Sequence, residues 1–223
     1  MESHDLPWLD TSGPRPLADR IAAEVARGIA DGDIPPGELL TEVEVAARHG
    51  ASRTPTREAM LMLSRWGLVR LIPKKGAQVT SPSARDRDEL LSVRSMLEGH
   101  AVSRIVGDDA RRQGLLDALE PILAAQDSCL DRPREFAVQD HAFHLRIIRF
   151  EGNSVVEQIL ADLAPRLYRL TRLAVGAPDA DRSALLEAHR DLVAAVRVRD
   201  TDMFRRLIQQ HLTSGHEHYE VAS

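Results

Sequence analysis

The chain has 223 residues, of which 43% are hydrophobic and 4% aromatic, and its formal net charge is −5. This apolar content excludes wholesale disorder, and the scarcity of aromatic residues favours a core of Leu, Val, Ile and Ala, as in helical bundles. No apolar run reaches membrane-spanning length, the start lacks a signal-peptide pattern, and the single cysteine cannot form an internal disulfide, so the sequence predicts a cytoplasmic protein.

Positive charge is concentrated in one segment. Residues 45–80 hold seven Arg and Lys residues against one Glu, a net charge of +6 within an acidic chain. Both lysines of the chain, Lys74 and Lys75, lie in this segment. Such a block indicates either a surface that binds a polyanion or a solvated basic face, and the surrounding elements must decide between the two.

The first 80 residues predict three short helices and a β-hairpin. Apolar residues recur every four positions between Leu17 and Ala30, which indicates a helix. Thr41 is placed to cap a second helix over 42–48, and Thr54 to cap a third helix that ends before Gly67. The runs LVRLI and AQVT, joined by PKKG, are typical of a hairpin.

Three helices followed by a hairpin describe a winged helix-turn-helix, in which one helix enters the major groove of DNA and the hairpin tip reaches neighbouring phosphates or the minor groove. We therefore predict that Arg53 and Arg57, four residues apart on one helix face, meet base edges. Lys74 and Lys75 at the tip are expected to contact phosphates, and Gly76 to let the backbone approach closely.

Two motifs carry a family resemblance. The stretch GDIPPGELLTEVEVAARHGASRTPTREAMLMLSRWGLV, followed by PKKGAQV, closely resembles the GntR family of bacterial transcription regulators over about residues 17–80. The resemblance implies that Arg53, Thr54 and Arg57 contact DNA from the recognition helix and that Gly76 marks the wing. Some members carry a basic residue in the second helix where this chain has Val43.

The second part of the chain is predicted to be an all-helical bundle, which makes the fold class mainly α. We place a winged helix-turn-helix domain at 1–80 with an N-terminal arm over 1–15, a linker at 81–85 and a helical effector-binding and dimerisation domain at 86–220. Pro121 and Pro165 are expected to kink or split two of its helices. The predicted helices span 84–106, 109–130, 134–150, 154–174, 182–198 and 201–218.

Polar residues lie within the apolar faces of three of these helices. Asp140 is central to one apolar stripe, with His144 at its edge, and His189 and His211 fall within the stripes of the last two helices. If those helices turn near Asp200, the two histidines are each 11 residues from the turn and lie at one height. Each residue alone has an ordinary explanation as a hydrogen-bonded core residue. Together they form a ligand set for a divalent transition metal, with zinc ahead of nickel, manganese or iron.

The segments QDHAFHLRII, GNS, EAHRDLVAAV and QQHL resemble the FCD-type C-terminal effector domain of the FadR branch of the GntR family. Many members of that branch carry an Asp-x-x-x-His pair and two further histidines as metal ligands. The corresponding residues here are the four just named. His141, His216 and His218 fall outside this pattern.

Arg94 lies near the middle of an apolar helix face. One explanation is an internal salt bridge with Glu98. The other explanation is a clamp for a small carboxylate that also binds the metal. The resemblance to family members of this type implies such an arrangement. The weaker candidates for this effector pocket are Gln126, Arg146, Arg149 and Asn153.

These patterns predict a transcription regulator, most simply a repressor, that binds a pseudo-palindromic operator as a homodimer and changes its operator affinity when a small organic acid binds. A metal sensor, in which the ion is itself the signal, is an alternative. A metal-dependent enzyme is a third hypothesis, but the sequence offers no spare general base near the site and no nucleophile motif, and the winged module would go unexplained. We therefore predict neither enzyme activity nor a membrane partner.

Overall fold

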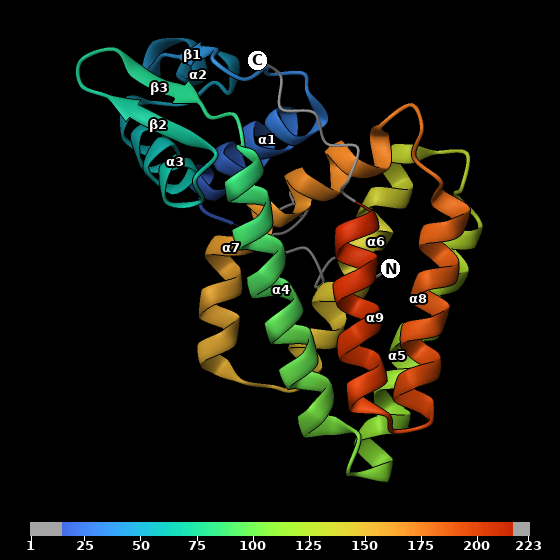
Figure 1. Cartoon of the computed structure of the whole chain (residues 1–223). Helices are drawn as coiled ribbons and strands as arrows, with labels where there is room; N and C mark the ends of the chain where they lie inside the picture. Colours follow the sequence, from blue (N-terminus) through green and yellow to red (C-terminus); the bar gives the residue numbers. More distant parts are fainter. Residues whose placement is uncertain (1–14, 216–223) are drawn as a thin grey trace. The chain divides into compact units, whose positions relative to one another are not determined.

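The computed structural model describes residues 15–215, which divide into two compact units (Figure 1). The first unit holds residues 15–82 together with 160–169, and the second holds 83–159 together with 170–215. Apart from Arg15, the predicted N-terminal arm lies outside the described residues. His216, His218 and the end of the last predicted helix also lie outside them.

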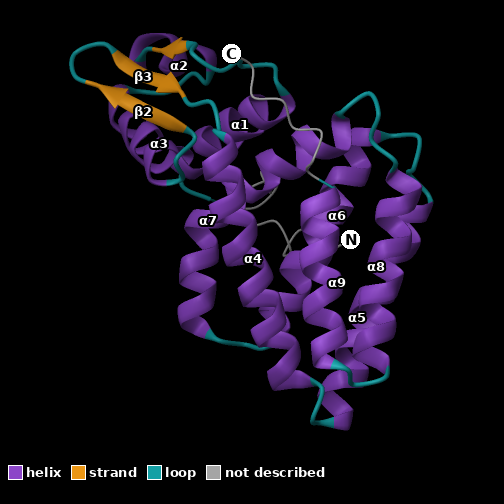
Figure 2. Cartoon of the chain, viewed as in Figure 1, coloured by secondary structure: helices purple, strands orange, loops and turns teal. Residues whose placement is uncertain are grey.

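Residues 15–82 form three helices and a three-stranded antiparallel sheet with strand order β1-β3-β2 (Figure 2). In chain order the elements are α1 (Leu17–Asp31), β1 (Leu39–Leu40), α2 (Glu42–Arg48), α3 (Arg53–Arg65), β2 (Val69–Ile72) and β3 (Gly76–Val79). This arrangement confirms the predicted winged helix-turn-helix.

The core of the first unit follows from the apolar stripe of α1. Ile21, Val25 and Ile29 recur on one face and are buried. They lie on the side where α1 packs against α3, whose Met60 and Leu63 are also buried. Each such side chain contributes roughly 1.5–3 kcal/mol when it is fully buried. The contact fixes α3 and leaves its opposite face to the solvent.

The predicted start of the second helix is confirmed, and that of the third is wrong by two residues. Thr41 and Glu44 form a capping box, in which each side chain accepts a hydrogen bond from the backbone N–H of the other. The N-cap of α3 is Ser52 instead of Thr54. With this start Pro55 still lies in the first turn, where its missing N–H has no intrahelical partner to lose.

Strand β1 is absent from the sequence prediction because two residues are too few to show an alternating pattern. The strand also gives Gly76 a role inside the fold. Gly76 has φ +126°, and a Cβ at this position would lie 2.2 Å from the carbonyl oxygen of Leu40. The close backbone approach predicted at Gly76 is therefore, in the structure, an approach to β1, and contact of Gly76 with DNA stays a prediction.

The second unit consists of packed helices, as predicted. Among the described residues, α5 packs against α6 and α8, α4 packs against α6 and α9, and α8 and α9 lie side by side (Figure 1). Phe143, Ile147, Leu192, Val196 and Phe204 belong to one buried cluster at the centre of this unit. Its helices are α4 (Ala84–Ile105), α5 (Asp109–Asp127), α6 (Pro133–Phe150), α8 (Arg182–Arg197), α9 (Thr201–Ser214) and both ends of α7 (Ser154–Gly176), whose residues 160–169 belong to the first unit.

Neither proline divides its helix. α5 continues through Pro121 and α7 through Pro165, so a split is wrong at both positions, and the alternative of a kink stays a prediction. A proline within a helix costs about 3 kcal/mol through the lost hydrogen bond and a steric clash. Leu119, two residues before Pro121, and Ile122, directly after it, are both buried, and packing of this kind offsets the cost.

None of the helices within residues 15–215 is both long enough and apolar enough to cross a membrane.

Candidate metal centre and DNA-contacting face

Four polar side chains meet inside the helical unit. Asp140 and His144 come from α6, His189 from α8 and His211 from α9, and each offers a ligand atom within 4.8 Å of the others. All four residues are buried. Asp140 and His144 share a face because they are four residues apart on one helix, and the packing of α8 on α9 pairs the other two. The four residues predicted from the sequence thus form a group that could hold a metal ion.

The three imidazoles direct their Nε2 atoms at one another. The Nε2 atoms of His144, His189 and His211 form a triangle with sides of 3.2 Å. The edge of a tetrahedron around zinc is about 3.3 Å for zinc–nitrogen bonds of roughly 2.0–2.1 Å. The carboxylate of Asp140 lies 3.5 Å from Nε2 of His189 and 4.0 Å from Nε2 of His144. The donor set therefore fits a divalent transition metal in both size and chemistry.

Outer hydrogen bonds fix two of these imidazoles. Nδ1 of His189 donates to Oε1 of Gln126 at 2.8 Å, and Nδ1 of His144 lies 2.9 Å from both carboxylate oxygens of Glu98. An imidazole that carries its proton on Nδ1 presents a lone pair at Nε2. Two lone pairs that face each other at 3.2 Å in a dry interior are costly, and a cation between them removes the cost.

Arg94 lies beside the cluster and is itself buried. Its Nε donates to Oε1 of Glu98 at 3.1 Å, which confirms the internal salt bridge considered from the sequence. Its Nη2 lies 3.9 Å from Oδ2 of Asp140 and has no hydrogen-bond partner among the described residues. Because an unpaired buried donor costs free energy, Nη2 is placed to receive an acceptor such as a carboxylate oxygen.

Burial shifts the pKa values of the acidic groups upward. It raises the pKa of Glu98 to about 8 and that of Asp140 to about 6, while the positive charge of Arg94 opposes both shifts. Burial, reinforced by His211 and Arg94, holds the pKa of His189 well below its usual value. His189 is therefore neutral and able to act as a ligand, and burial disfavours the charged forms of the two carboxyl groups.

The exposed face of α3 carries the predicted DNA contacts. Arg53, Thr54 and Arg57 are exposed, whereas Met60 and Leu63 on the other side of the helix are buried. The spacing of the two arginines places both guanidinium groups on one side of α3. This face therefore presents bidentate donors to the solvent, which suits the recognition of base edges or phosphates.

The hairpin between β2 and β3 exposes Lys74 and Lys75 at its tip. The backbone N–H of Lys75 donates to the carbonyl of Ile72 at 3.0 Å, and Lys74 has φ +62°. With Pro73 in the second position, these features define a type II turn. Both lysine side chains thus stand on a tight turn and not on a long loop.

Two known protein families match this chain. The family described as "Bacterial regulatory proteins, gntR family" matches residues 17–79, and the FCD domain matches residues 89–214. The chain belongs to the GntR family. It is a DNA-binding transcription regulator, and because this family and the relatives below are regulators, the prediction that the chain is not an enzyme is confirmed.

Several transcription regulators are similar to this chain over most of its length. A regulator from an unstable DNA locus of Streptomyces ambofaciens is 30% identical over 192 residues, which cover 81% of this chain and 75% of the relative. The gluconate operon transcriptional repressor of Bacillus subtilis is 28% identical over 198 residues, which cover 86% of this chain and 80% of the repressor. The structure of Escherichia coli McbR/YncC shares this fold with a TM-score of 0.70 and 22% identity, covering 92% of this chain and 99% of that one.

The weaker effector candidates of this GntR-family protein have other contacts. Asn153 is exposed and caps α7, because its Oδ1 accepts from two backbone N–H groups of the first turn at 3.0 and 3.3 Å. Nε of Arg149 donates to Glu157 at 3.2 Å. Arg146 is partly buried, and His141 is buried but does not belong to the cluster. Roles of Asn153 and Arg146 in effector binding stay predictions.

Glu98 and Gln126 are the site residues that sequence reasoning undervalued. Glu98 is foreseen only as the partner of Arg94, and Gln126 only as a weak pocket candidate, yet each lies against a ligand imidazole. Both are 0% exposed. A polar residue within an apolar helix face is the same signal that identifies Asp140, so the signal was present on α4 and α5 as well.

Proposed function

We propose that this GntR-family regulator is a repressor whose helical domain holds a divalent cation at Asp140, His144, His189 and His211. The observation that carries the proposal is the buried triangle of Nε2 atoms at 3.2 Å, with the Asp140 carboxylate beside it. Zinc is the preferred ion because it favours imidazole and carboxylate ligands, and nickel, manganese and iron are the alternatives.

A small carboxylate is the proposed effector. Nη2 of Arg94 has no hydrogen-bond partner among the described residues and lies 3.9 Å from Asp140. Its positive charge would attract the carboxylate of an effector that binds beside Asp140. A bound cation would supply a second electrostatic anchor for the same carboxylate. One relative is named for the gluconate operon, and gluconate is itself a carboxylate. Arg146 is a further candidate contact.

Two copies of the chain are proposed to bind the operator together. A homodimer working in the cytoplasm would present two α3 helices to the half-sites of a pseudo-palindromic operator. An effector that prefers one arrangement of the dimer changes operator affinity by its differential binding free energy, typically about 1–3 kcal/mol. Two relatives, those of the gluconate and D-xylose operons, are named repressors, which supports this direction of control.

A metal sensor is the second candidate. The observation in its favour is that Nε of Arg94 is already bonded to Glu98, so part of the guanidinium is committed to the protein itself. In that case occupancy of the four-residue cluster would alter operator affinity without an organic acid.

Titration of operator binding tests both candidates. Metal content of the purified protein is measured first, and operator fragments are selected from random DNA. Binding is then titrated against Zn²⁺ alone and against Zn²⁺ with citrate or gluconate. We expect the acid to change operator affinity about 5–150-fold and the Arg94→Lys variant to lose this response while it keeps the metal.

Each outcome has a distinct meaning. A response to Zn²⁺ with no further effect of any acid favours the sensor. A protein that contains no metal and takes up none in dialysis refutes the proposed metal centre. An Arg94→Lys variant that responds to acids normally shows that the clamp lies elsewhere.

A further inference from the structure

The cluster lies inside the helical unit, so an ion needs a route to it. His189 is 0% exposed, His144 1% and Asp140 4%, whereas His211 is 6% exposed, the largest fraction in the set. His211 and Asp140 are thus the two members of the cluster with most exposure, and a neighbouring pocket distinguishes between them.

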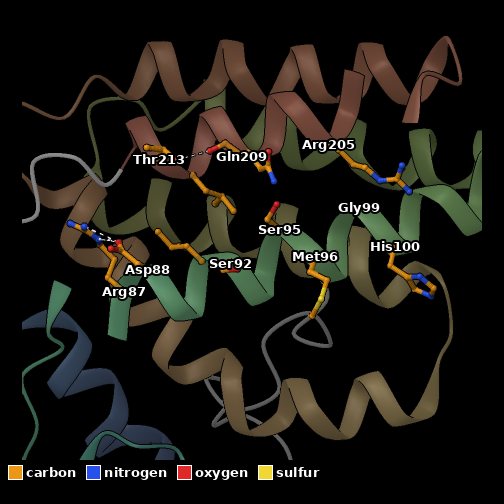
Figure 3. Close-up of a pocket in the computed structure, with 12 residues that line it drawn as sticks. Arg87, Asp88, Ser92, Ser95, Met96, Gly99, His100, Arg205, Gln209 and Thr213 are labelled. Carbon is orange, nitrogen blue, oxygen red and sulfur yellow. Dashed lines mark hydrogen bonds and ion pairs between the residues drawn. The ribbon is translucent and has the colours of Figure 1, made fainter. Parts of the chain in front are cut away.

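A pocket of about 190 Å³ is lined by the ends of α7 and α9 and the first half of α8, and His211 is among its lining residues. The larger groove of about 950 Å³ between α4 and α9 includes none of the four cluster residues in its lining (Figure 3). In Figure 3, Ser95 of α4 points toward Gln209 of α9 across this groove. The smaller pocket thus reaches a ligand residue, and the larger groove does not.

Small side chains dominate the lining of the smaller pocket, which we call the alanine pocket. A methyl group occupies little space and offers no donor atom that could retain a divalent cation on its way. A lining of this kind suits passage better than storage. The five alanines among its twelve lining residues are Ala174, Ala177, Ala180, Ala184 and Ala188.

Negative charge stands at the alanine pocket where α7 leads into α8. Asp179 and Asp181 line it and are both exposed. Asp181 keeps its orientation because it caps α8, accepting from the N–H of Ala184 at 3.0 Å. The neighbouring Arg182 is directed elsewhere, since its guanidinium donates to the carbonyl groups of residues 130 and 175. Carboxylates around an opening raise the local concentration of cations.

We propose that the alanine pocket is the passage by which a divalent cation enters and leaves the cluster, with Asp179 and Asp181 drawing the ion to its opening. This inference rests on the proposed metal centre but concerns the rate of exchange and not the affinity. A narrowed passage slows entry and exit together, so the dissociation constant, which is the ratio of the two rates, stays the same.

Ala184→Leu and Ala177→Leu, made separately, narrow the passage. Ala194→Leu is the matched control, because Ala194 is an exposed alanine of α8 outside the pocket lining. In a stopped-flow instrument, the full-length apo-protein is mixed with Zn²⁺ and a fluorescent zinc indicator to follow uptake, and the zinc-loaded protein is mixed with excess indicator to follow release. We expect the two pocket variants to slow uptake and release several-fold with an unchanged dissociation constant, and the control to match the unsubstituted protein.

The double variant Asp179→Asn, Asp181→Asn tests the charge at the opening. Asparagine also caps helices, so α8 keeps its cap. Asp191→Asn is the control, because Asp191 is an exposed carboxylate of α8 outside the pocket. We expect Zn²⁺ uptake by the double variant to be up to about tenfold slower at low ionic strength, with the difference shrinking as salt rises.

The two proposals fail in different ways. If the protein binds Zn²⁺ and neither leucine variant changes the rate of uptake or release, the passage is refuted and the metal centre stands. If the leucine variants change the dissociation constant and leave the release rate unaltered, the pocket affects ligand geometry and the passage is again refuted. A protein that takes up no Zn²⁺ at all refutes both.

Discussion

Lys74 holds a backbone conformation that its side chain disfavours. It occupies the third position of the type II turn with φ +62°, where glycine is preferred. A non-glycine residue in this left-handed region costs roughly 1–2 kcal/mol. Among residues 15–215, the only other non-glycine residue with positive φ is Arg199. A long cation kept at this cost supports the prediction that Lys74 contacts a DNA phosphate.

Lys74→Gly is therefore expected to raise the stability of the fold and to lower the affinity for DNA. Glycine relieves the strained conformation, so the free energy of unfolding should rise by up to about 1 kcal/mol, while operator affinity falls because a phosphate contact is lost. Urea unfolding of the full chain, followed by tryptophan fluorescence, and operator titration measure the two effects. Lys75→Gly is the control, since it removes the same charge without relieving a positive φ. Lower stability in Lys74→Gly would contradict the explanation.

Glu98→Gln is expected to weaken metal binding without touching a ligand. Glu98 holds Nδ1 of His144 at 2.9 Å, and loss of such an outer carboxylate typically costs about 10–100-fold in metal affinity. Competition between the protein and a chelator for Zn²⁺ measures the effect. Glu120→Gln, an exposed change on α5, is the control. Equal affinities in the two variants would remove Glu98 from the site.

The sequence was sufficient to predict the four cluster residues, but not the residues that hydrogen-bond to their imidazoles. Asp140 and His144 share a stripe on one helix, and His189 and His211 are equidistant from one turn, so periodicity and chain distance were sufficient. The contact between Gln126 and His189 depends on how α5 packs against α8, which no spacing along the chain records.

At the level of helices and strands, local chemistry set most of the boundaries. The capping box at Thr41 fixes the start of α2, Asp181 caps α8 and Asp200 caps α9. The errors arose where packing overrides local preference. β1 exists because β3 pairs with it, and α5 continues through Pro121 because the nearby Leu119 and Ile122 are buried.

Substitutions in the recognition helix α3 and in the wing are expected to impair DNA binding in different ways. Arg53→Ala on α3 should remove operator-specific binding and leave the oligomeric state intact, because Arg53 is exposed at the start of α3 and contributes nothing to the core. Gel shifts with operator and scrambled DNA, together with sedimentation, check both parts. Specific binding that persists in this variant would exclude Arg53 from base recognition.

Lys74 and Lys75 changed together to Ala should weaken binding to all sequences alike. Each lost phosphate contact reduces the slope of log affinity against log salt by about 0.9. Binding isotherms at four or more salt concentrations measure the slope. A slope equal to that of the unsubstituted protein would mean that the wing does not touch DNA.

For the whole molecule, metal binding is expected to stabilise the folded state. Arg94 and Glu98 of α4, Gln126 of α5, and the ligands of α6, α8 and α9 converge on one point. A ligand present at 100 times its dissociation constant adds about 2.7 kcal/mol. Thermal unfolding with and without Zn²⁺ should show a higher midpoint for the unsubstituted protein and for His100→Ala, an exposed change, but not for His211→Ala. A midpoint in His211→Ala that still rises with Zn²⁺ would place the ion elsewhere.

The link between β3 and α4 is short. β3 ends at Val79 and α4 begins at Ala84, so four residues, spanning at most roughly 17 Å between those two positions, connect the wing to the helix that carries Arg94 and Glu98. Because this connection is short, we expect a turn or slide of α4, caused by the proposed effector at Arg94, to displace the strand that ends the hairpin. Ligand binding in the helical domain would then change the position of the wing through the chain itself, without a second protein.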